Sequence, residues 1–276
     1  MIELSRAGFT NGNPTPPRMS VVPRELINQS LFLYGTFEIS ETRLIQSVLR
    51  AGMTFLDIGA NIGYYTIVGA RLVGPTGVVH CFEPHAGIRA RLQENVARNG
   101  YQNVTVHGEA MAETTGTVTF FASADEQNQG TSSILPGSGR SAARVVPSVC
   151  LDEFVAGLNP LRVDLIKMDI EGAELHAING GRRTLAADDA PPIIFEAADL
   201  EPIARALGAF GYRIKRHTYT LARGLELLEP DAAFENIFGD YEAPNYFAAK
   251  DPAVFQRAIA TANATRPAAL RLLGRI

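Results

Sequence analysis

The sequence predicts an α/β fold in which helices flank a mostly parallel sheet. A short apolar strand at 53–58 runs into a glycine-rich turn, and a helical pattern follows at 64–72. A second buried strand, at 78–82, ends in Glu83. Strand, glycine turn and helix are the first half of a nucleotide-binding βαβ unit, and such short apolar runs are typical of parallel strands buried on both faces.

Length and composition favour one large domain. The chain has 276 residues, 46% of them hydrophobic, which suits a full core. We place this domain at 31–250, after an N-terminal arm at 1–30 and before a helical tail at 251–276. Turn and polyproline chemistry around 11–17 predicts a mobile terminus; a flap over the active site or a homodimer contact is the other interpretation.

Charge and cysteine content argue against several classes of protein. The formal net charge is −4 and no basic run of five or more residues occurs, which argues against a nucleic-acid partner. No signal pattern and no apolar stretch of membrane-spanning length is seen, so we expect no membrane partner. Cys81 and Cys150 lack metal-ligand spacing and suit a reducing, cytoplasmic compartment.

The domain begins with an apolar, aromatic stretch at 31–39. Ser40 then has the chemistry of a helix N-cap, Glu41 falls in the first turn, and Leu44 and Val48 belong to the buried stripe. Glu38, just before this helix, either faces solvent or reaches a bound ligand, and we favour the ligand.

Two acids at strand ends indicate the kind of ligand. Asp57 ends the first strand beside the glycine turn, where a carboxylate repels phosphate but attracts an ammonium or a sulfonium. Glu83 follows 26 residues later, near the spacing of about 20 for an acid that binds ribose hydroxyls. Together they predict S-adenosylmethionine (SAM); a purely structural turn or another nucleotide is the alternative.

The expected cofactor site combines the turn, the strand ends and the loop after a third strand at 103–106. Small and apolar residues in that loop suit the flat slot that an adenine ring needs. Glu38 would reach the amino group of the cofactor. The cofactor-binding candidates are Glu38, Asp57, Gly59, Asn61, Gly63, Tyr64, Glu83, Ala110, Met111 and Asp169.

A hairpin is expected next. The strand at 117–121 alternates, 145–149 returns as a strand, and the segment 125–140 between them is rich in Gly, Ser, Asn and Gln. The hydroxyls at its centre could bind a polyol acceptor, although an ordinary loop fits equally well. These substrate-binding candidates are Thr131, Ser132 and Ser133.

Further acids follow the next two strands. The strand at 163–168 ends in Asp169 and Glu171, and the strand at 193–195 ends in Glu196. Open α/β sheets bind ligands at the carboxyl ends of their strands, so we expect these acids near the glycine turn. Asp169 and Glu171 could instead cap the following helix, or hold Mg²⁺, for which no third ligand is obvious; we therefore predict no metal.

The remaining elements complete the domain. A helix at 203–210 precedes a strand at 212–216 that leads to His217. A strand at 245–249 and a terminal helix at 252–273 follow.

Several of these stretches resemble the FkbM-type SAM-dependent methyltransferases. They are residues 55–65, Phe82-Glu83-Pro84, Leu151-Asp152-Glu153 and the Asp-x-Glu-Gly-x-Glu stretch within 166–174, which is the most specific. The resemblance covers about 34–196. It implies a single class I methyltransferase (Rossmann-like) domain with a seven-stranded sheet, here with an inserted β-hairpin. It also implies O-methylation of a hydroxyl on a small-molecule acceptor, such as a sugar or a secondary metabolite.

Methyl transfer to oxygen is an in-line displacement that depends on positioning. An aliphatic hydroxyl is a poor nucleophile, so a carboxylate or a histidine should take its proton. Asp169 is our first choice as general base. Glu171 and Glu196 come next, as alternative bases or hydroxyl binders, and His217 is the last catalytic candidate.

Three other functions stay open at this stage. An NAD(P)-dependent oxidoreductase is disfavoured because the G-x-G-x-x-G pattern is absent and Asp57 would face a pyrophosphate. A non-catalytic SAM-fold interaction module leaves the acids at the strand ends unexplained. N-methylation would need no strong base.

Overall fold

The computed structural model describes residues 2–4, 16–20, 31, 36–123, 132–137, 140–159, 162–220, 223–232 and 244–264. Its centre is one twisted sheet with the strand order β12-β11-β13-β10-β9-β3-β4-β5. Neighbours among β3, β4, β5, β9 and β10 are parallel, whereas β13 runs antiparallel to both β10 and β11. The strands are β3 (Thr54–Ile58), β4 (Val78–Phe82), β5 (Val104–His107), β9 (Leu165–Met168), β10 (Ile193–Glu196), β11 (Arg213–Thr220), β12 (Gly224–Leu228) and β13 (Asn245–Ala249).

The predicted mostly parallel α/β architecture is confirmed, with one strand more than expected. β12 pairs antiparallel with β11, with His217 opposite Leu227, and so adds an eighth strand at one edge. Leu225 of β12 is buried in the core, which fixes this strand on the sheet. The sequence analysis assigned residues 223–228 to no element.

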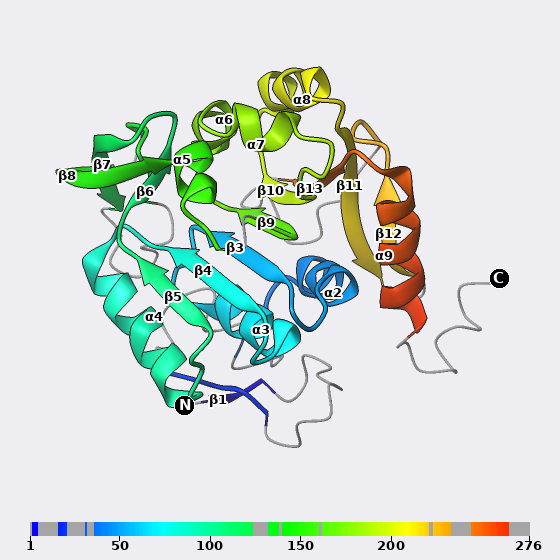
Figure 1. The fold of residues 1–276 in the computed structure, drawn as a ribbon, viewed down its shortest axis with the longest axis horizontal. Helices are drawn as coiled ribbons and strands as arrows, with labels where there is room; N and C mark the ends of the chain where they lie inside the picture. The colour runs from blue at the N-terminus through cyan, green and yellow to red at the C-terminus, as the bar shows by residue number, and fades with distance from the viewer. Residues whose placement is uncertain are drawn as a thin grey trace.

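Helices cover both faces of the sheet (Figure 1). One face carries α2 (Ile39–Val48), α3 (Tyr64–Val73), α4 (Ala86–Arg98) and α9 (Pro252–Ala264). The other carries α5 (Leu151–Ala156), α6 (Glu174–Asn179), α7 (Arg182–Ala186) and α8 (Leu200–Ala209). Within the described part of the chain, no helix has the length and apolar character needed to cross a bilayer.

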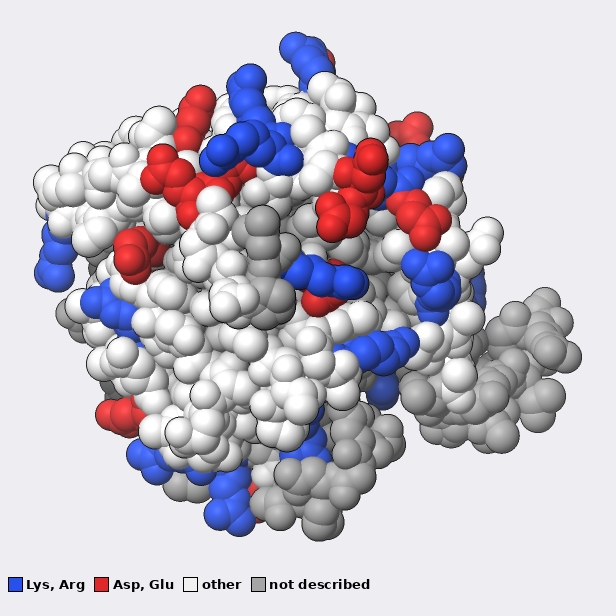
Figure 2. Space-filling view, viewed as in Figure 1, with Lys and Arg blue, Asp and Glu red and all other residues white. Residues whose placement is uncertain are grey.

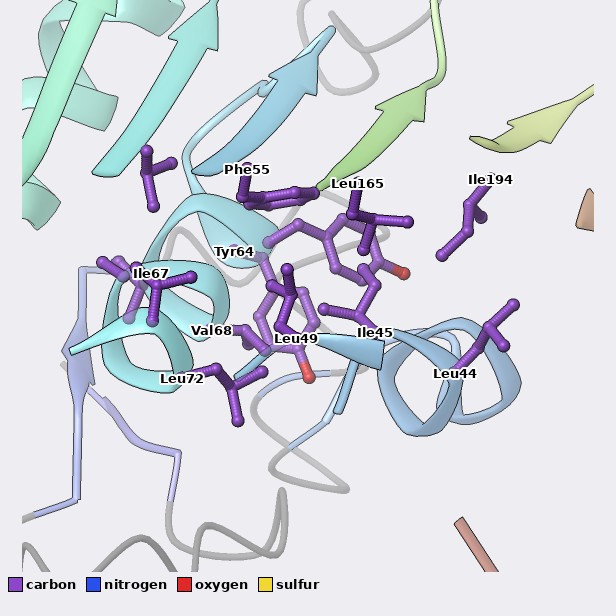
Figure 3. Packing of buried hydrophobic residues seen from close by; sticks show 14 of the residues in the cluster. Leu44, Ile45, Leu49, Phe55, Tyr64, Ile67, Val68, Leu72, Leu165 and Ile194 are labelled. Carbon is purple, nitrogen blue, oxygen red and sulfur yellow. The ribbon is translucent and has the colours of Figure 1, made fainter. Parts of the chain in front are cut away.

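The central strands alternate between two hydrophobic clusters. Phe55 and Leu165 face the helices α2 and α3, where Tyr64 also packs (Figure 3). Leu56 and Ile166 face the opposite cluster. Burial on both faces explains the nearly unbroken apolar runs of β3 and β9. Because side chains alternate along a strand, Asp57 and Lys167 point to the face covered by α2 and α3.

The start of α2 differs from the prediction. Glu38, not Ser40, is the N-cap residue, and its backbone is left-handed, with a φ of 37°. Ser40 lies inside the first turn, so the Ser40 N-cap prediction is wrong. Glu38 therefore lies at the N-terminus of α2.

The inserted hairpin forms a small sheet of its own. Its strands β6 (Ala110–Ala112), β7 (Gly116–Ser123) and β8 (Arg140–Cys150) lie in the order β6-β8-β7. β7 and β8 are antiparallel, as predicted for the hairpin, and β6 runs parallel to β8.

The described residues of the N-terminal arm are docked on the domain. β1 (Ile2–Glu3) pairs with β2 (Arg18–Met19), and Leu4 and Met19 are fully buried in the core. The expectation of a mobile terminus is therefore wrong for residues 2–4 and 16–20.

On the face drawn in Figure 2, the described basic and acidic side chains are interspersed.

Candidate active site

The glycine turn after β3 lies against the end of β9. Gly59 has a φ of 82°, and a Cβ added there would be 1.9 Å from the backbone oxygen of Asp169. Gly63 has a φ of 92° and is the N-cap residue of α3. Only glycine fits both the left-handed backbone and the close approach at position 59. The turn and the strand end of Asp169 are therefore in direct contact.

Asp57 lies at the end of β3 and is fully buried. Thr66 Oγ1 donates a hydrogen bond of 2.6 Å to Asp57 Oδ2. Asp57 Oδ1 has no hydrogen-bond partner among the described residues. Burial raises the pKa of Asp57, and Lys167 and Thr66 offset part of this rise. An unpaired carboxylate oxygen in this position suits a cationic ligand.

Glu83 ties the end of β4 to the glycine turn. Its two carboxylate oxygens accept hydrogen bonds from the backbone N–H groups of His85, at 2.8 Å, and Asn61, at 3.1 Å. Asn61 is left-handed, with a φ of 50°. Burial raises the pKa of Glu83 to about 7, although both N–H groups oppose the rise. Each oxygen retains a lone pair for a further donor, such as a ribose hydroxyl.

Strand register brings further polar residues to the face that Asp57 occupies. Lys167 of β9 is the register partner of Asp57, and Glu196 of β10 is the partner of Asn245. Asp169 follows β9 directly and accepts a hydrogen bond of 3.1 Å from Lys167 Nζ on Oδ2. The structure thus brings Asp57, Asp169 and Glu196 together at the carboxyl ends of β3, β9 and β10, on the sheet face that α2 and α3 cover.

Lys167 is the main site residue that the sequence analysis missed. Its side chain is only 3% exposed, and its ammonium lies 4.9 Å from the ring centre of Tyr65. Burial acts to lower the pKa of Lys167, but Asp169 and the other acids around it outweigh burial and raise that pKa. A lysine inside an otherwise apolar strand was the available signal, because a buried charge requires partners.

Two glutamates of the α2 region face this lysine. Tyr65 donates a hydrogen bond of 2.6 Å to Glu38 Oε2. Glu41, which the sequence analysis treated only as a first-turn acid, is 2% exposed, and its Oε1 has no hydrogen-bond partner among the described residues. Burial and then Glu38 raise the pKa of Glu41 well above its usual value, while Lys167 opposes them.

The acids after β9 and β10 are close enough to influence one another. Burial and then Asp169 raise the pKa of Glu171 to about 7. Burial, Asp169 and Glu38 raise the pKa of Glu196 to about 9. Glu171 has a φ of 56°, and its carbonyl oxygen accepts a hydrogen bond of 3.1 Å from Arg140 Nη2.

The alternative that Asp169 and Glu171 cap the following helix is wrong. The N-cap residue of α6 is Ala173, without a side-chain cap. Glu174 closes the turn instead, because its Oε1 accepts a hydrogen bond of 2.9 Å from the Ile170 N–H. Asp169 and Glu171 therefore have no helix-capping role that would explain them.

Three further predicted site residues, Tyr64, Ala110 and Met111, are buried. Tyr64 packs in the core, where its hydroxyl is 3.1 Å from Thr36 Oγ1 and 3.0 Å from Thr42 Oγ1. Ala110 and Met111 are buried in β6, and Met111 belongs to the core cluster on the far face.

His217 lies on β11 and is 4% exposed. Neither ring nitrogen has a hydrogen-bond partner among the described residues, and burial alone lowers the pKa of His217 to about 3. The imidazole is therefore neutral, and none of the acids contributes to its shift.

Two serines between β7 and β8 form hydrogen bonds with backbone groups, one of them in the segment that follows β9. Ser133 Oγ donates a hydrogen bond of 3.1 Å to the carbonyl of Ile170 and accepts one of 3.2 Å from the Leu135 N–H. Ser132 Oγ accepts one of 3.0 Å from the Ser123 N–H. Thr131 lies outside the described residues. The hydroxyl of Ser133 therefore holds the loop against the segment that follows β9.

Among the described residues, no three Asp, Glu, His or Cys side chains gather as metal ligands. The Mg²⁺ alternative gains no support from this part of the chain.

Comparison with known proteins identifies methyltransferases as the relatives of this chain. The sequence matches the methyltransferase FkbM domain over residues 57–214, which is more than half of the chain. A protein-L-isoaspartate O-methyltransferase of Ignicoccus hospitalis is 41% identical over 119 residues, covering 37% of this chain and 56% of that protein. A second, of Methanothrix thermoacetophila, is 38% identical over 58 residues, covering 21% of this chain and 28% of that protein.

A crystal structure of a methyltransferase FkbM from Methylobacillus flagellatus KT is 22% identical, with a TM-score of 0.45. The aligned part covers 74% of this chain and 48% of that one. The chain thus spans about half, or less, of the length of these proteins.

The mostly parallel sheet, the helices on both of its faces and the glycine turn after β3 are those of a Rossmann-like, SAM-dependent methyltransferase domain. The chain belongs to the methyltransferase FkbM family.

Proposed function

We propose that this protein is a SAM-dependent O-methyltransferase that acts on a hydroxyl of a small-molecule acceptor, with Asp169 as the general base. One observation carries the proposal. Asp169 joins the two halves of the site, because its backbone oxygen abuts Gly59 of the cofactor turn while its carboxylate is held by the buried Lys167. A base in this position lies beside the turn that we expect to hold the cofactor.

SAM supplies a methyl group on a positively charged sulfur, which leaves as a neutral thioether. Glu83 has lone pairs for the ribose hydroxyls, and the unpaired Oδ1 of Asp57 attracts the positive part of the cofactor. Asp169 takes the proton of the acceptor hydroxyl as the new C–O bond forms and the C–S bond breaks. Because the proton moves to a carboxylate, the acceptor oxygen never has to carry a full negative charge.

The acceptor class is the finer part of the proposal. Glu171 and Glu196 border Asp169 and can hydrogen-bond a polyol, as in a sugar or a secondary metabolite. The free, buried Cys81 and Cys150 fit the reducing cytoplasm in which we expect the enzyme to act. A homodimer formed through the arm is the remaining partner hypothesis.

The decisive experiment compares the wild type with Asp169→Asn. Calorimetry with S-adenosylhomocysteine (SAH) should show that both bind the cofactor product. Methyl transfer to a panel of hydroxyl acceptors should fall by about 10²–10⁴-fold in the variant. Isoaspartyl peptides belong in the panel because of the names of the curated relatives, and a carboxylate acceptor would need no base.

Each other outcome favours a different function. An unchanged rate in Asp169→Asn would favour N-methylation or a carboxylate acceptor. Stabilisation by SAM without product on any acceptor would favour a non-catalytic module. Binding of a nicotinamide cofactor without SAM stabilisation would favour an oxidoreductase.

A further inference from the structure

The side chain of Lys167 is more deeply buried than that of Asp169, with which it forms an ion pair. The lysine side chain is 3% exposed and the aspartate side chain is 30% exposed, and 3.1 Å separates Nζ from Oδ2. The ammonium is therefore inside the protein, and the carboxylate is at the border with solvent. One oxygen of Asp169 is committed to the lysine, which leaves Oδ1 for a ligand.

A buried ammonium is stable here only because its surroundings compensate for lost hydration. The ring of Tyr65 lies 4.9 Å from Nζ and supplies a cation–π contact. Lys167 is also the register partner of Asp57. The hydrogen bond to Asp169 is the closest of its contacts with acids.

More acids surround this lysine than one cation can balance. The charged and titratable groups that face the cluster come from α2, α3, β3, β8, the turn after β9, α6 and β10. They are Glu38, Glu41, Asp57, Tyr65, Arg140, Asp169, Glu171, Glu174 and Glu196. Like charges in a buried site raise one another's proton affinity, and burial with neighbouring acids raises the pKa values of Glu41, Glu171, Glu174 and Glu196.

The acids around Lys167 differ in how they contact it. Among the described residues, Asp169 is the acid that forms a direct ion pair with the lysine, at 3.1 Å. Burial and neighbouring acids raise the pKa of Glu196 to about 9 and that of Glu171 to about 7. The carboxylate whose position the lysine fixes is therefore Asp169, the proposed base.

We propose that Lys167 is a positioning residue that holds the Asp169 carboxylate by one oxygen and leaves Oδ1 for the acceptor hydroxyl. The proposal rests on the proposed function for the role of Asp169. Lys167 keeps its three protons throughout the reaction. The acceptor proton moves to Asp169, and no proton passes through the lysine.

The test uses the full-length protein and does not depend on knowing the acceptor. Aspartate is labelled with ¹³C at the side-chain carboxyl, and the Asp169 signal is identified by its loss in Asp169→Asn. The pH titration of this signal in the wild type with bound SAH is the reference. In Lys167→Met, which keeps the length of the side chain, its titration midpoint should rise by at least about one pH unit. Lys167→Arg should restore the wild-type titration.

Lys215→Met is the matched control. Lys215 is a lysine of β11 that pairs with the exposed Glu229, so its loss should leave the Asp169 titration unchanged. If Lys167→Met fails to fold, the titration is read in Lys167→Gln, which removes the charge but keeps a hydrogen-bond donor for Asp169.

Two results would overturn the proposal. One is an Asp169 titration in Lys167→Met that coincides with the wild type. The other is an Asp169 titration in Lys167→Arg that coincides with that of Lys167→Met, which would show that the positive charge at position 167 does not act on Asp169. Both titrations can be measured without an acceptor. A failure of the proposed function can therefore be told apart from a failure of the role proposed for Lys167. Once an acceptor is identified, Lys167→Met should lower kcat at least ten-fold with little change in KM. Lys167→Arg should restore kcat.

Discussion

Thr66, in the first turn of α3, donates its hydroxyl proton to the buried carboxylate of Asp57 at 2.6 Å. The bond links the helix that follows the glycine turn to the strand that precedes it. Oδ1 of the same carboxylate has no hydrogen-bond partner among the described residues. Thr66 therefore helps to keep this carboxylate charged and fixed in orientation.

Thr66→Val should weaken SAH binding by about ten-fold, which corresponds to about 1.4 kcal/mol. The same change should lower the free energy of unfolding by about 1–3 kcal/mol, because a buried acceptor loses its donor. Calorimetric titration and urea unfolding measure the two effects. Thr42→Val is the control: Thr42 is also buried, but it bonds Phe37 and Tyr64 in the core, so stability should fall while SAH affinity stays the same.

Gly59→Ala should destabilise the protein by more than about 4 kcal/mol or prevent folding. A Cβ there would meet the Asp169 carbonyl oxygen at 1.9 Å, and this backbone contact cannot relax by a change of rotamer. Gly100→Ala gives the comparison, because Gly100 also has a positive φ, of 67°, but nothing lies within 4 Å of the added Cβ. It should cost only about 1–3 kcal/mol for the backbone conformation. Equal losses in urea unfolding would refute the close-contact explanation.

Stability should depend on pH through the buried glutamates. Burial raises the pKa of Glu174 to about 7 from the ordinary value of 4.5, so the folded state binds this proton more tightly than the unfolded state. The resulting stabilisation, on the order of 3 kcal/mol, is present below pH 4.5 and is lost as the pH rises through 7. Glu83 and Glu171 shift in the same direction.

The free energy of unfolding should thus fall between pH 5 and pH 8, and it should fall less in Glu174→Gln. Glutamine keeps the oxygen that accepts the Ile170 hydrogen bond, so the variant removes the titration with little loss of contacts. Glu94→Gln, at an exposed position of α4, should reproduce the wild-type slope. A slope that Glu174→Gln leaves unchanged would show that other groups cause the pH dependence.

The parts of the site that were predictable from sequence are those fixed by local pattern. Asp57, Gly59 and Glu83 lie where apolar strands end, and strand ends in a parallel sheet meet at one edge. The hairpin was predictable for the same reason, since alternation and loop composition are local signals.

The missed parts depend on contacts between distant segments. Lys167 and Glu41 face one another only because β9 pairs with β3 and α2 packs over the same sheet face. Neither the register nor the packing of α2 can be derived from one short stretch. The eighth strand and the docked arm were missed for the same reason. β12 and β2 are short, and both are held by residues that are distant in the sequence.

The docked arm leads to a last prediction, about Asn95 of α4. This side chain is fully buried, accepts a hydrogen bond of 2.8 Å from the Ser20 N–H and donates one of 2.9 Å to the Ile62 carbonyl. It therefore connects the arm to the glycine turn. Asn99, one helical turn later, accepts a hydrogen bond from the Arg18 N–H on Oδ1 and donates one from Nδ2 to the Arg18 carbonyl, but among the described residues it has no hydrogen bond to the glycine turn.

Asn95→Ala should release the arm and loosen the turn, whereas Asn99→Ala should release only the arm. Hydrogen exchange should rise at 16–20 in both variants and at 59–63 in Asn95→Ala alone. Because the turn carries the Asn61 N–H that holds Glu83, SAH affinity should fall about three- to ten-fold in Asn95→Ala and stay near wild type in Asn99→Ala. Equal affinity losses in the two variants would mean that the arm itself, rather than the Asn95–Ile62 bond, supports the cofactor site.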